Sequence, residues 1–178
     1  NMYFNHSIIN SKLEKMTKNV HLAYNKNDVN LEEFYKKDYN IRSSRAVALH
    51  IKYKMYSILQ DAYTESEQTN YENFIKCLED DYVFERLAKN EHDRWMAYMR
   101  TLGFESVESK YVKKYYTQLQ HYVHFLAKLH PALVPYDEIE NVEKQIGVSL
   151  KNNDSEIIRK LPNIIEIEKG KNMHEKRL

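Results

Sequence analysis

Glycine and proline are scarce in this sequence, which has three of each among its 178 residues. Their usual shares are about 7% and 5%, so both lie far below the ordinary frequency. A doubly wound sheet or a barrel needs many tight turns, and a nucleotide-binding sheet also needs glycines where the backbone approaches phosphate. The sequence therefore predicts an all-α fold, a single helical domain of about six to eight helices.

The sequence also has only one cysteine, no excess of one charge and no long apolar run. The single cysteine, Cys77, excludes an internal disulfide framework and is typical of a reducing compartment. The 27 basic and 26 acidic residues leave a net charge of +1, so nothing in the composition requires nucleic acid or an anionic membrane as partner. No apolar run approaches the about 20 residues of a membrane span, and no secretory leader is evident. We expect a soluble, cytoplasmic protein.

Apolar residues at helical spacing predict helices along most of the chain. The expected helices cover residues 8–24, 31–37, 43–63, a segment beginning at Asn70, 81–102, 111–129, 137–150, and a last helix that Asp154 or Ser155 caps and Pro162 breaks or kinks. Gly103 is expected to end the helix at 81–102, and the proline-containing segment after residue 129 to form a short extended connector. We expect residues 1–80 to pack as a helical segment on a domain of residues 81–167, followed by a flexible tail, 168–178.

The helix expected at 81–102 carries the most informative pattern of the chain. Its apolar stripe includes Glu91 and His92, at positions where leucine or alanine would pack better. Burying a charged group without a partner costs several kcal/mol, so these two side chains need partners. Either the fold satisfies them internally, or they line a binding site. The apolar members of the stripe are Phe84, Leu87, Ala88, Trp95, Met99 and Leu102.

Two motifs and a closing segment occur in a distinctive order. The first motif consists of Leu87, Ala88, Glu91, His92, Arg94 and Trp95, followed by Leu102-Gly103-Phe104. The second runs from Leu129 to Glu138 and includes His130-Pro131 and Pro135-Tyr136-Asp137. Together they resemble the RYR domain, the module repeated in ryanodine receptors and also found in bacterial proteins. Residues 157–165 are similar to the closing helix of that domain, so the resemblance covers residues 81–167.

The segment from Ser43 to Ile51 is similar to the one that precedes RYR domains in bacterial proteins with a TrkA-type Rossmann domain. The resemblance therefore implies that this chain is the C-terminal part of such a protein, or a relative without the Rossmann domain. The family implies a helical regulatory or ligand-binding module without established catalysis. The chain departs from the family at Gly103-Phe104-Glu105-Ser106, where Gly-Trp and then Tyr-Gly are usual, which puts a shared ligand in doubt.

From these residues we expect a non-catalytic regulatory module that binds a small ligand, with a nucleotide as the preferred candidate. The expected cleft lies between the helix that carries Arg45 and the helix that carries Glu91. In this cleft Arg45 and Arg94 would pair with phosphate or carboxylate, an aromatic ring would stack on a base, and Glu91 would fix the tautomer of the neighbouring histidine. The expected ligand-binding residues are Arg45, His50, Glu91, His92, Arg94, Trp95, His130 and Tyr136.

Two other functions remain open from the sequence. The first is a helical protein-interaction module, in which the polar cluster is satisfied inside the fold and an exposed face, such as Tyr111–Tyr122, contacts a partner. The second is a metal phosphohydrolase of the HD type, in which His50, His92 and Asp93 hold a divalent ion. The His121 and His124 pair lacks the further ligands of a zinc site. We expect no metal and no cofactor.

Overall fold

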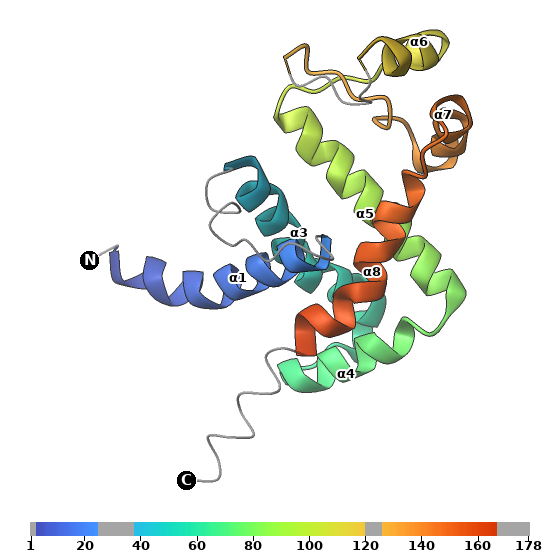
Figure 1. Ribbon diagram of the computed structural model, residues 1–178. Coiled ribbons are helices and arrows are strands. Elements are labelled where there is room, and N and C mark those ends of the chain that lie inside the picture. Colours follow the sequence, from blue (N-terminus) through green and yellow to red (C-terminus); the bar gives the residue numbers. More distant parts are fainter. Residues whose placement is uncertain (1–2, 25–37, 120–125, 167–178) are drawn as a thin grey trace. The chain divides into compact units, whose positions relative to one another are not determined.

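The computed structural model describes residues 3–24, 38–119 and 126–166 (Figure 1). These residues form seven α-helices, two short 3₁₀ turns and no strand, which confirms the prediction of an all-α fold. None of the described helices combines the length and the apolar character needed to cross a membrane. The helices are α1 (Tyr3–Tyr24), α3 (Asp38–Leu59), α4 (Glu67–Cys77), α5 (Asp81–Thr101), α6 (Ser109–Leu119), α7 (Ile139–Ile146) and α8 (Lys151–Glu166), and the turns are η1 (Gln60–Ala62) and η2 (Tyr136–Glu138).

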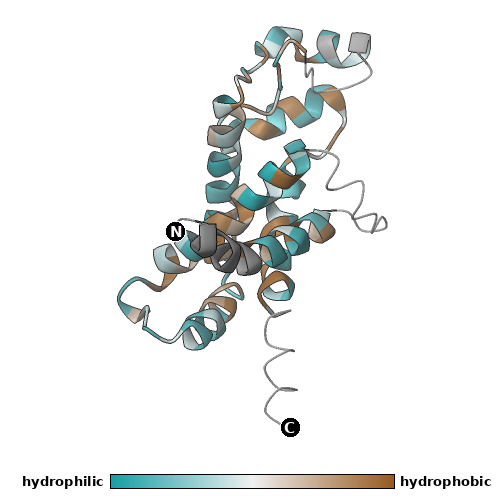
Figure 2. Cartoon of the chain, turned by 90° about the vertical axis from the view of Figure 1, so that its left-hand side faces the viewer, coloured by the Kyte–Doolittle hydropathy of each residue, from teal (hydrophilic) through white to brown (hydrophobic). Residues whose placement is uncertain are grey.

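The described residues group into two compact units. The first unit contains the described residues of 1–84 together with 159–166, and the second contains those of 85–158. The boundaries between the units fall inside α5 and inside α8. The domain ranges expected from the sequence stay a prediction. Apolar and polar residues alternate around the helices (Figure 2), as expected where one face of a helix is buried.

In the first unit α3 packs against both α1 and α4. Figure 1 shows α1 alongside α3. Ser44 and Ala48 of α3 are buried, and side chains this small let a neighbouring helix approach closely. The buried apolar residues of this unit are Val20, Val47, Ala48, Ile51, Met55, Leu59, Tyr71, Phe74, Leu161, Ile164 and Ile165.

In the second unit α6 packs against α7. The loop that follows α5 is hydrogen-bonded through the backbone of Glu105 to Lys128 and His130, at the start of the proline-containing connector. Gly103 adopts a positive φ of 81° just beyond α5, so the prediction that it ends this helix is confirmed. Met96, Met99, Phe104 and Leu133 form an apolar cluster that continues the buried side of α5. The other buried apolar residues of this unit are Leu87, Ala88, Val107, Val112, Ala132, Tyr136, Ile139, Val142, Ile146, Leu150, Ile157 and Ile158.

Helix α4 starts earlier than predicted because a polar side chain has another role. Helix α4 begins at Glu67 rather than Asn70, since the hydroxyl of Ser66 accepts a hydrogen bond from the Thr69 N–H. Asn70 instead holds the preceding loop, accepting from the N–H of Thr64 at 2.8 Å and donating to its carbonyl at 2.7 Å. Helix α3 also begins earlier than predicted, at Asp38, five residues before the expected start at residue 43.

The last helix was predicted to begin at Asp154 or Ser155, and this is wrong. Helix α8 begins at Lys151, because a carboxylate oxygen of Glu143 accepts hydrogen bonds from the N–H groups of Leu150 and Lys151 at 2.6 and 2.7 Å. This contact from α7 satisfies donors that a helix start otherwise leaves without intrahelical partners. Pro162 lies inside α8 and does not break it.

The helix predicted at 111–129 is also too long. Helix α6 ends at Leu119, and residues 126–128 form a turn in which Lys128 has a φ of 54°. Two backbone hydrogen bonds hold this part of the chain: the Glu105 N–H donates to the Lys128 carbonyl at 2.8 Å, and the His130 N–H donates to the Glu105 carbonyl at 2.9 Å. The predicted helix at 31–37 and the pair His121 and His124 lie outside the described residues.

Candidate functional site

The polar residues of α5 lie inside its buried stripe, as the helical spacing predicts. Glu91 and His92 are only 1% and 2% exposed, and Arg94 is 8% exposed. Leu87 and Ala88, one turn earlier, and Met99, further along, are buried on the same helix. Charged groups this deeply buried are tolerated only with good hydrogen-bonding partners.

Glu91 and Arg94 are partners of each other. The Nε of Arg94 donates to both carboxylate oxygens of Glu91 at 3.0 Å, and Nη2 donates to Oε1 at 2.6 Å. A spacing of three residues places the two side chains on the same side of a helix, and the planar guanidinium matches the carboxylate. The guanidinium expected to bind a phosphate group thus forms a buried ion pair within α5.

His92 joins three segments of the second unit. Its Nδ1 lies 3.1 Å from Oδ2 of Asp154 in the first turn of α8, and its Nε2 lies 2.8 Å from the carbonyl oxygen of Val134 in the connector. A carboxylate and a carbonyl both accept hydrogen bonds, so His92 donates from both ring nitrogens only as the positively charged imidazolium. The ring also lies 5.5 Å from Trp95 and 5.8 Å from Tyr136, measured between centroids.

The pKa values agree with an imidazolium–carboxylate pair. Burial disfavours the charged form of His92, but the hydrogen bonds to Asp154 and Val134 and the negative charge of Asp154 outweigh it and raise the pKa of His92 above 6.5. Burial also raises the pKa of Asp154 above 3.8, against the opposing effect of His92. Between these two pKa values His92 is positive and Asp154 negative, so each neutralises the other.

His130 has the opposite protonation. Its Nδ1 accepts a hydrogen bond from the Ala132 N–H at 3.2 Å, so this nitrogen carries no proton. Burial and then the positive charge of His92 lower the pKa of His130 to about 4. The ring packs edge-on against Trp95 at 4.8 Å between centroids. His130 is therefore a neutral residue that shapes the connector.

Tyr136 closes the cluster from the connector side and is 2% exposed. Burial, and then the nearby negative charge of Glu85, raise the pKa of its phenol to about 12. Nζ of Lys151 lies 4.4 Å from the centre of the Tyr136 ring. At the surface beside it, Lys89 and Asp137 form an ion pair of 2.9 Å that also links α5 to η2.

The eight predicted site residues thus fall into two groups. Six belong to the second unit, where His92, Trp95, His130 and Tyr136 contact one another through their rings and Glu91 pairs with Arg94. The other two, Arg45 and His50, belong to α3 in the first unit. Arg45 forms an ion pair with Glu14 of α1, and the His50 ring lies 5.6 Å from that of Tyr53. The cleft expected between the two helices stays a prediction.

The metal-site alternative finds little support in the part of the chain that the structure describes. No group of three or more histidine, cysteine, aspartate or glutamate side chains is placed there to hold a metal ion. Both ring nitrogens of His92 are already hydrogen-bonded, and Asp93 is exposed on another side of α5. The donor set that the HD-type hypothesis requires is not assembled among these residues.

Sequence reasoning assigned Asp154 as a helix cap and did not include it in the ligand site. Its position opposite His92 depends on the path of α8, which no local pattern near Asp154 indicates. The Val134 carbonyl was missed for a simpler reason, because a backbone acceptor carries no residue-type signal. The one available signal was the buried position of His92. A buried imidazole needs hydrogen-bonding partners, but the sequence does not show which groups they are.

An open hollow lies on the same unit near the end of α5. It has a volume of about 480 Å³, and Phe104 and Leu133 provide its apolar part. Arg100 and Glu105, both exposed, bring opposite charges to it. Its full lining is Arg100, Gly103, Phe104, Glu105, Ser106 and Leu133, none of which was among the predicted site residues.

Breaking the Glu91–Arg94 pair on one side tests its structural role. Arg94→Met leaves a buried carboxylate without its partner and should lower the free energy of unfolding by about 3–5 kcal/mol, measured by urea denaturation. The double variant Glu91→Leu/Arg94→Met removes both charges and should be clearly more stable than the single variant. Additive losses in the double-mutant cycle would show that the two side chains are not coupled.

His130 makes stability depend on acid pH. Its pKa is about 4 in the fold and about 6.5 when unfolded, so the unfolded chain binds the extra proton between these values. Stability should therefore fall by about 3 kcal/mol as the pH drops from 6.5 to 4. His92, with its raised pKa, adds stability that is complete below pH 6.5 and is lost only above it. The urea midpoint should depend less on pH across this range in His130→Asn than in the unmodified chain. The control His50→Asn should keep the full dependence.

Comparison of the chain with models of known protein families, with curated proteins and with solved structures finds no match. The resemblance to the RYR domain therefore stays a prediction from its two motifs.

Proposed function

We propose that this chain is a non-catalytic protein-interaction module in which the polar cluster of α5 stabilises the fold. The observation that carries this proposal is the burial of Glu91, His92 and Arg94, with their charges paired by groups of the same unit. A ligand would have to displace these partners before it reached the charges. The interaction hypothesis required a cluster whose charges are paired inside the fold, as these are, and the nucleotide hypothesis required an accessible one.

Among the described residues, the surface that favours interaction is on α3. The tyrosine-rich face expected at Tyr111–Tyr122 lies partly outside the described residues and stays a prediction. Val47, Ile51 and Met55 bury one side of α3 in the first unit. On the opposite side, at spacings of four and three residues, Leu49, Tyr53 and Tyr56 are 52%, 70% and 61% exposed. We call Leu49, Lys52, Tyr53 and Tyr56 the outer face of α3. A helix that is apolar on two opposite sides is typical of one that packs between two neighbours.

Tyrosine suits such a surface because its rigid ring offers a large contact area while the hydroxyl tolerates water. The apolar residues of the hollow at the end of α5, Phe104 and Leu133, are by contrast buried. Among the described residues, the outer face of α3 is thus the feature that a protein partner fits best.

Site-specific photocrosslinking tests this proposal. With p-benzoylphenylalanine in place of Tyr53, irradiation in an extract of the cells that express the chain should yield a discrete protein adduct. The adduct should disappear in a second chain that also carries Leu49→Ser and Tyr56→Ser. The matched control places the same probe at Tyr82, which is 75% exposed in the same unit but belongs to α5 and not to the outer face of α3. Identical adducts from both positions would contradict the proposal.

Small-ligand binding is a second candidate function, favoured by the hollow of about 480 Å³. This volume lies within the about 300–1,000 Å³ of small-molecule pockets, and Arg100 offers a cation at its edge. If a nucleotide binds here, it pairs with Arg100 rather than with Arg94, whose guanidinium already holds Glu91.

Thermal shifts decide between the two candidate functions. Nucleoside mono-, di- and triphosphates, NAD and cyclic dinucleotides are each added to the purified chain. A ligand at 100 times its dissociation constant stabilises the fold by about 2.7 kcal/mol, which raises Tm by several degrees. Our primary proposal predicts no such shift. A shift that Arg100→Ala abolishes and the exposed control Arg86→Ala retains would instead establish the ligand site.

A further inference from the structure

The buried His92 ring has an acceptor on each side and therefore responds to the loss of a single proton. Its Nδ1 lies 3.1 Å from the carboxylate of Asp154, and its Nε2 lies 2.8 Å from the carbonyl oxygen of Val134. Both contacts are hydrogen bonds only while the His92–Asp154 pair keeps its extra proton. After that proton leaves, one N–H remains for two acceptors, and the other ring nitrogen presents a lone pair to an oxygen. One of the two contacts then has to break.

The contact with Val134 is the one that breaks. A hydrogen bond to a charged carboxylate is roughly twice as strong as one to a neutral carbonyl, so the remaining N–H stays with Asp154. Asp154 is also part of α8, whose start is fixed by Glu143 of α7. Val134 is only half-buried and the next residue, Pro135, is exposed. Water can therefore hydrogen-bond to the Val134 carbonyl once the connector moves.

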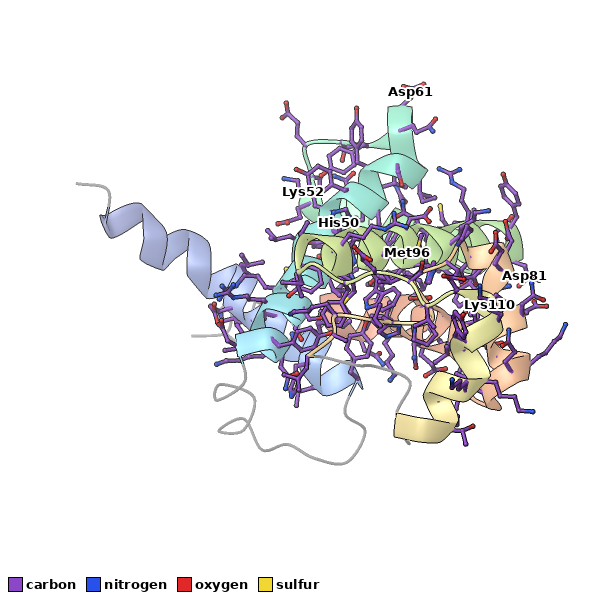
Figure 3. All side chains as sticks on the ribbon, turned by 90° about the horizontal axis from the view of Figure 1, so that it is seen from above. His50, Lys52, Asp61, Asp81, Met96 and Lys110 are labelled. Carbon is purple, nitrogen blue, oxygen red and sulfur yellow. The ribbon has the colours of Figure 1, made fainter. Side chains whose placement is uncertain are left out.

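The connector covers part of the indole of Trp95. The His130 ring packs edge-on against this indole at 4.8 Å between centroids. Leu133, directly before Val134, belongs to the apolar cluster on which Trp95 packs. Figure 3 shows Met96, another member of this cluster, on α5. Movement of the connector at Val134 would therefore make Trp95 accessible from solvent.

We propose that His92 is a pH-dependent switch of the second unit. With its proton, the ring holds the connector at Val134 next to α5 and α8. Without that proton, the ring stays with Asp154 and the connector moves away at Val134. Trp95 is then covered at acid pH and accessible at alkaline pH. The switch concerns the second unit alone and does not depend on what the outer face of α3 binds.

The groups around His92 set the pH range of this switch. Burial lowers the pKa of His92, but the contacts with Asp154 and Val134 outweigh it, so this pKa lies above 6.5. The covered form therefore prevails below pH 6.5, and the connector is released as the pH rises through the pKa of His92 in the fold. The pKa of His130 is about 4 and that of Tyr136 is about 12, so neither group changes its charge in this range. The charged and titratable groups around the His92–Asp154 pair are Glu91, Asp93 and Arg94 of α5, His130 of the connector, Tyr136 of η2 and, beside Tyr136, Glu85 and Lys151.

Acrylamide quenching of Trp95, the one tryptophan of the sequence, measures the release. In the full chain, the Stern–Volmer constant from fluorescence lifetimes should rise about two-fold or more from about pH 6 to 9, as expected for a local opening. The midpoint of this rise should coincide with the titration of the His92 ring, measured by ¹⁵N NMR. Helical content, measured by circular dichroism, should stay unchanged, because the connector before η2 contains no helix.

Two variants test whether His92 causes the change. Asp154→Asn keeps an acceptor for Nδ1 but removes the negative charge, so the midpoint should fall by at least about one pH unit. His92→Gln removes the titrating ring, so the Stern–Volmer constant should no longer depend on pH in this range. The control His50→Gln, on α3 in the first unit, should leave the midpoint unchanged.

A Stern–Volmer constant that does not change across this pH range overturns the inference. A midpoint that Asp154→Asn leaves in place also overturns it, because the release is then not tied to the His92–Asp154 pair. A rise accompanied by loss of helical content overturns it as well, since the helices then unfold together with the connector. If His92→Gln does not fold, the midpoint in Asp154→Asn and the titration of the ring still decide the question.

Discussion

The second unit depends on one doubly hydrogen-bonded histidine. His92 connects α5, the connector at Val134 and the first turn of α8, and these segments are far apart in sequence. Each contact requires an N–H on a different ring nitrogen, so both contacts form only when His92 is positively charged. A neutral histidine would keep only one donor, and either the connector or Asp154 would lose its partner.

The surrounding residues follow from this one charge. Asp154 neutralises it, and Glu91 and Arg94 neutralise each other beside it, so the buried cluster carries no net charge when these groups are ionised. His130 stays neutral mainly because burial lowers its pKa, and the nearby positive charge of His92 acts in the same direction. A cluster balanced in this way is suited to holding segments together. The binding surface proposed for this protein therefore lies on the outer face of α3 and not on α5.

Local patterns identified the helices and the unusual positions, and failed where a distant contact decides. The stripe from Leu87 to Met99 predicted that Glu91 and His92 would be buried, because helical spacing alone fixes which side chains share a face. The start of α8 could not be predicted, since Glu143 of another helix supplies its cap. The helix predicted to extend to residue 129 is too long because the backbone of Glu105 forms hydrogen bonds with Lys128 and His130, which lie far from it in sequence.

The sequence by itself determined an all-α fold, through its scarcity of glycine and proline and its helical spacing of apolar residues. It also determined that Glu91 and His92 need partners, because a buried charge is costly wherever it lies. Only the tertiary structure decided which groups are the partners of Glu91 and His92. Arg94, Asp154 and the Val134 carbonyl are selected by the way α5, α8 and the connector pack, and no spacing along the chain encodes that arrangement.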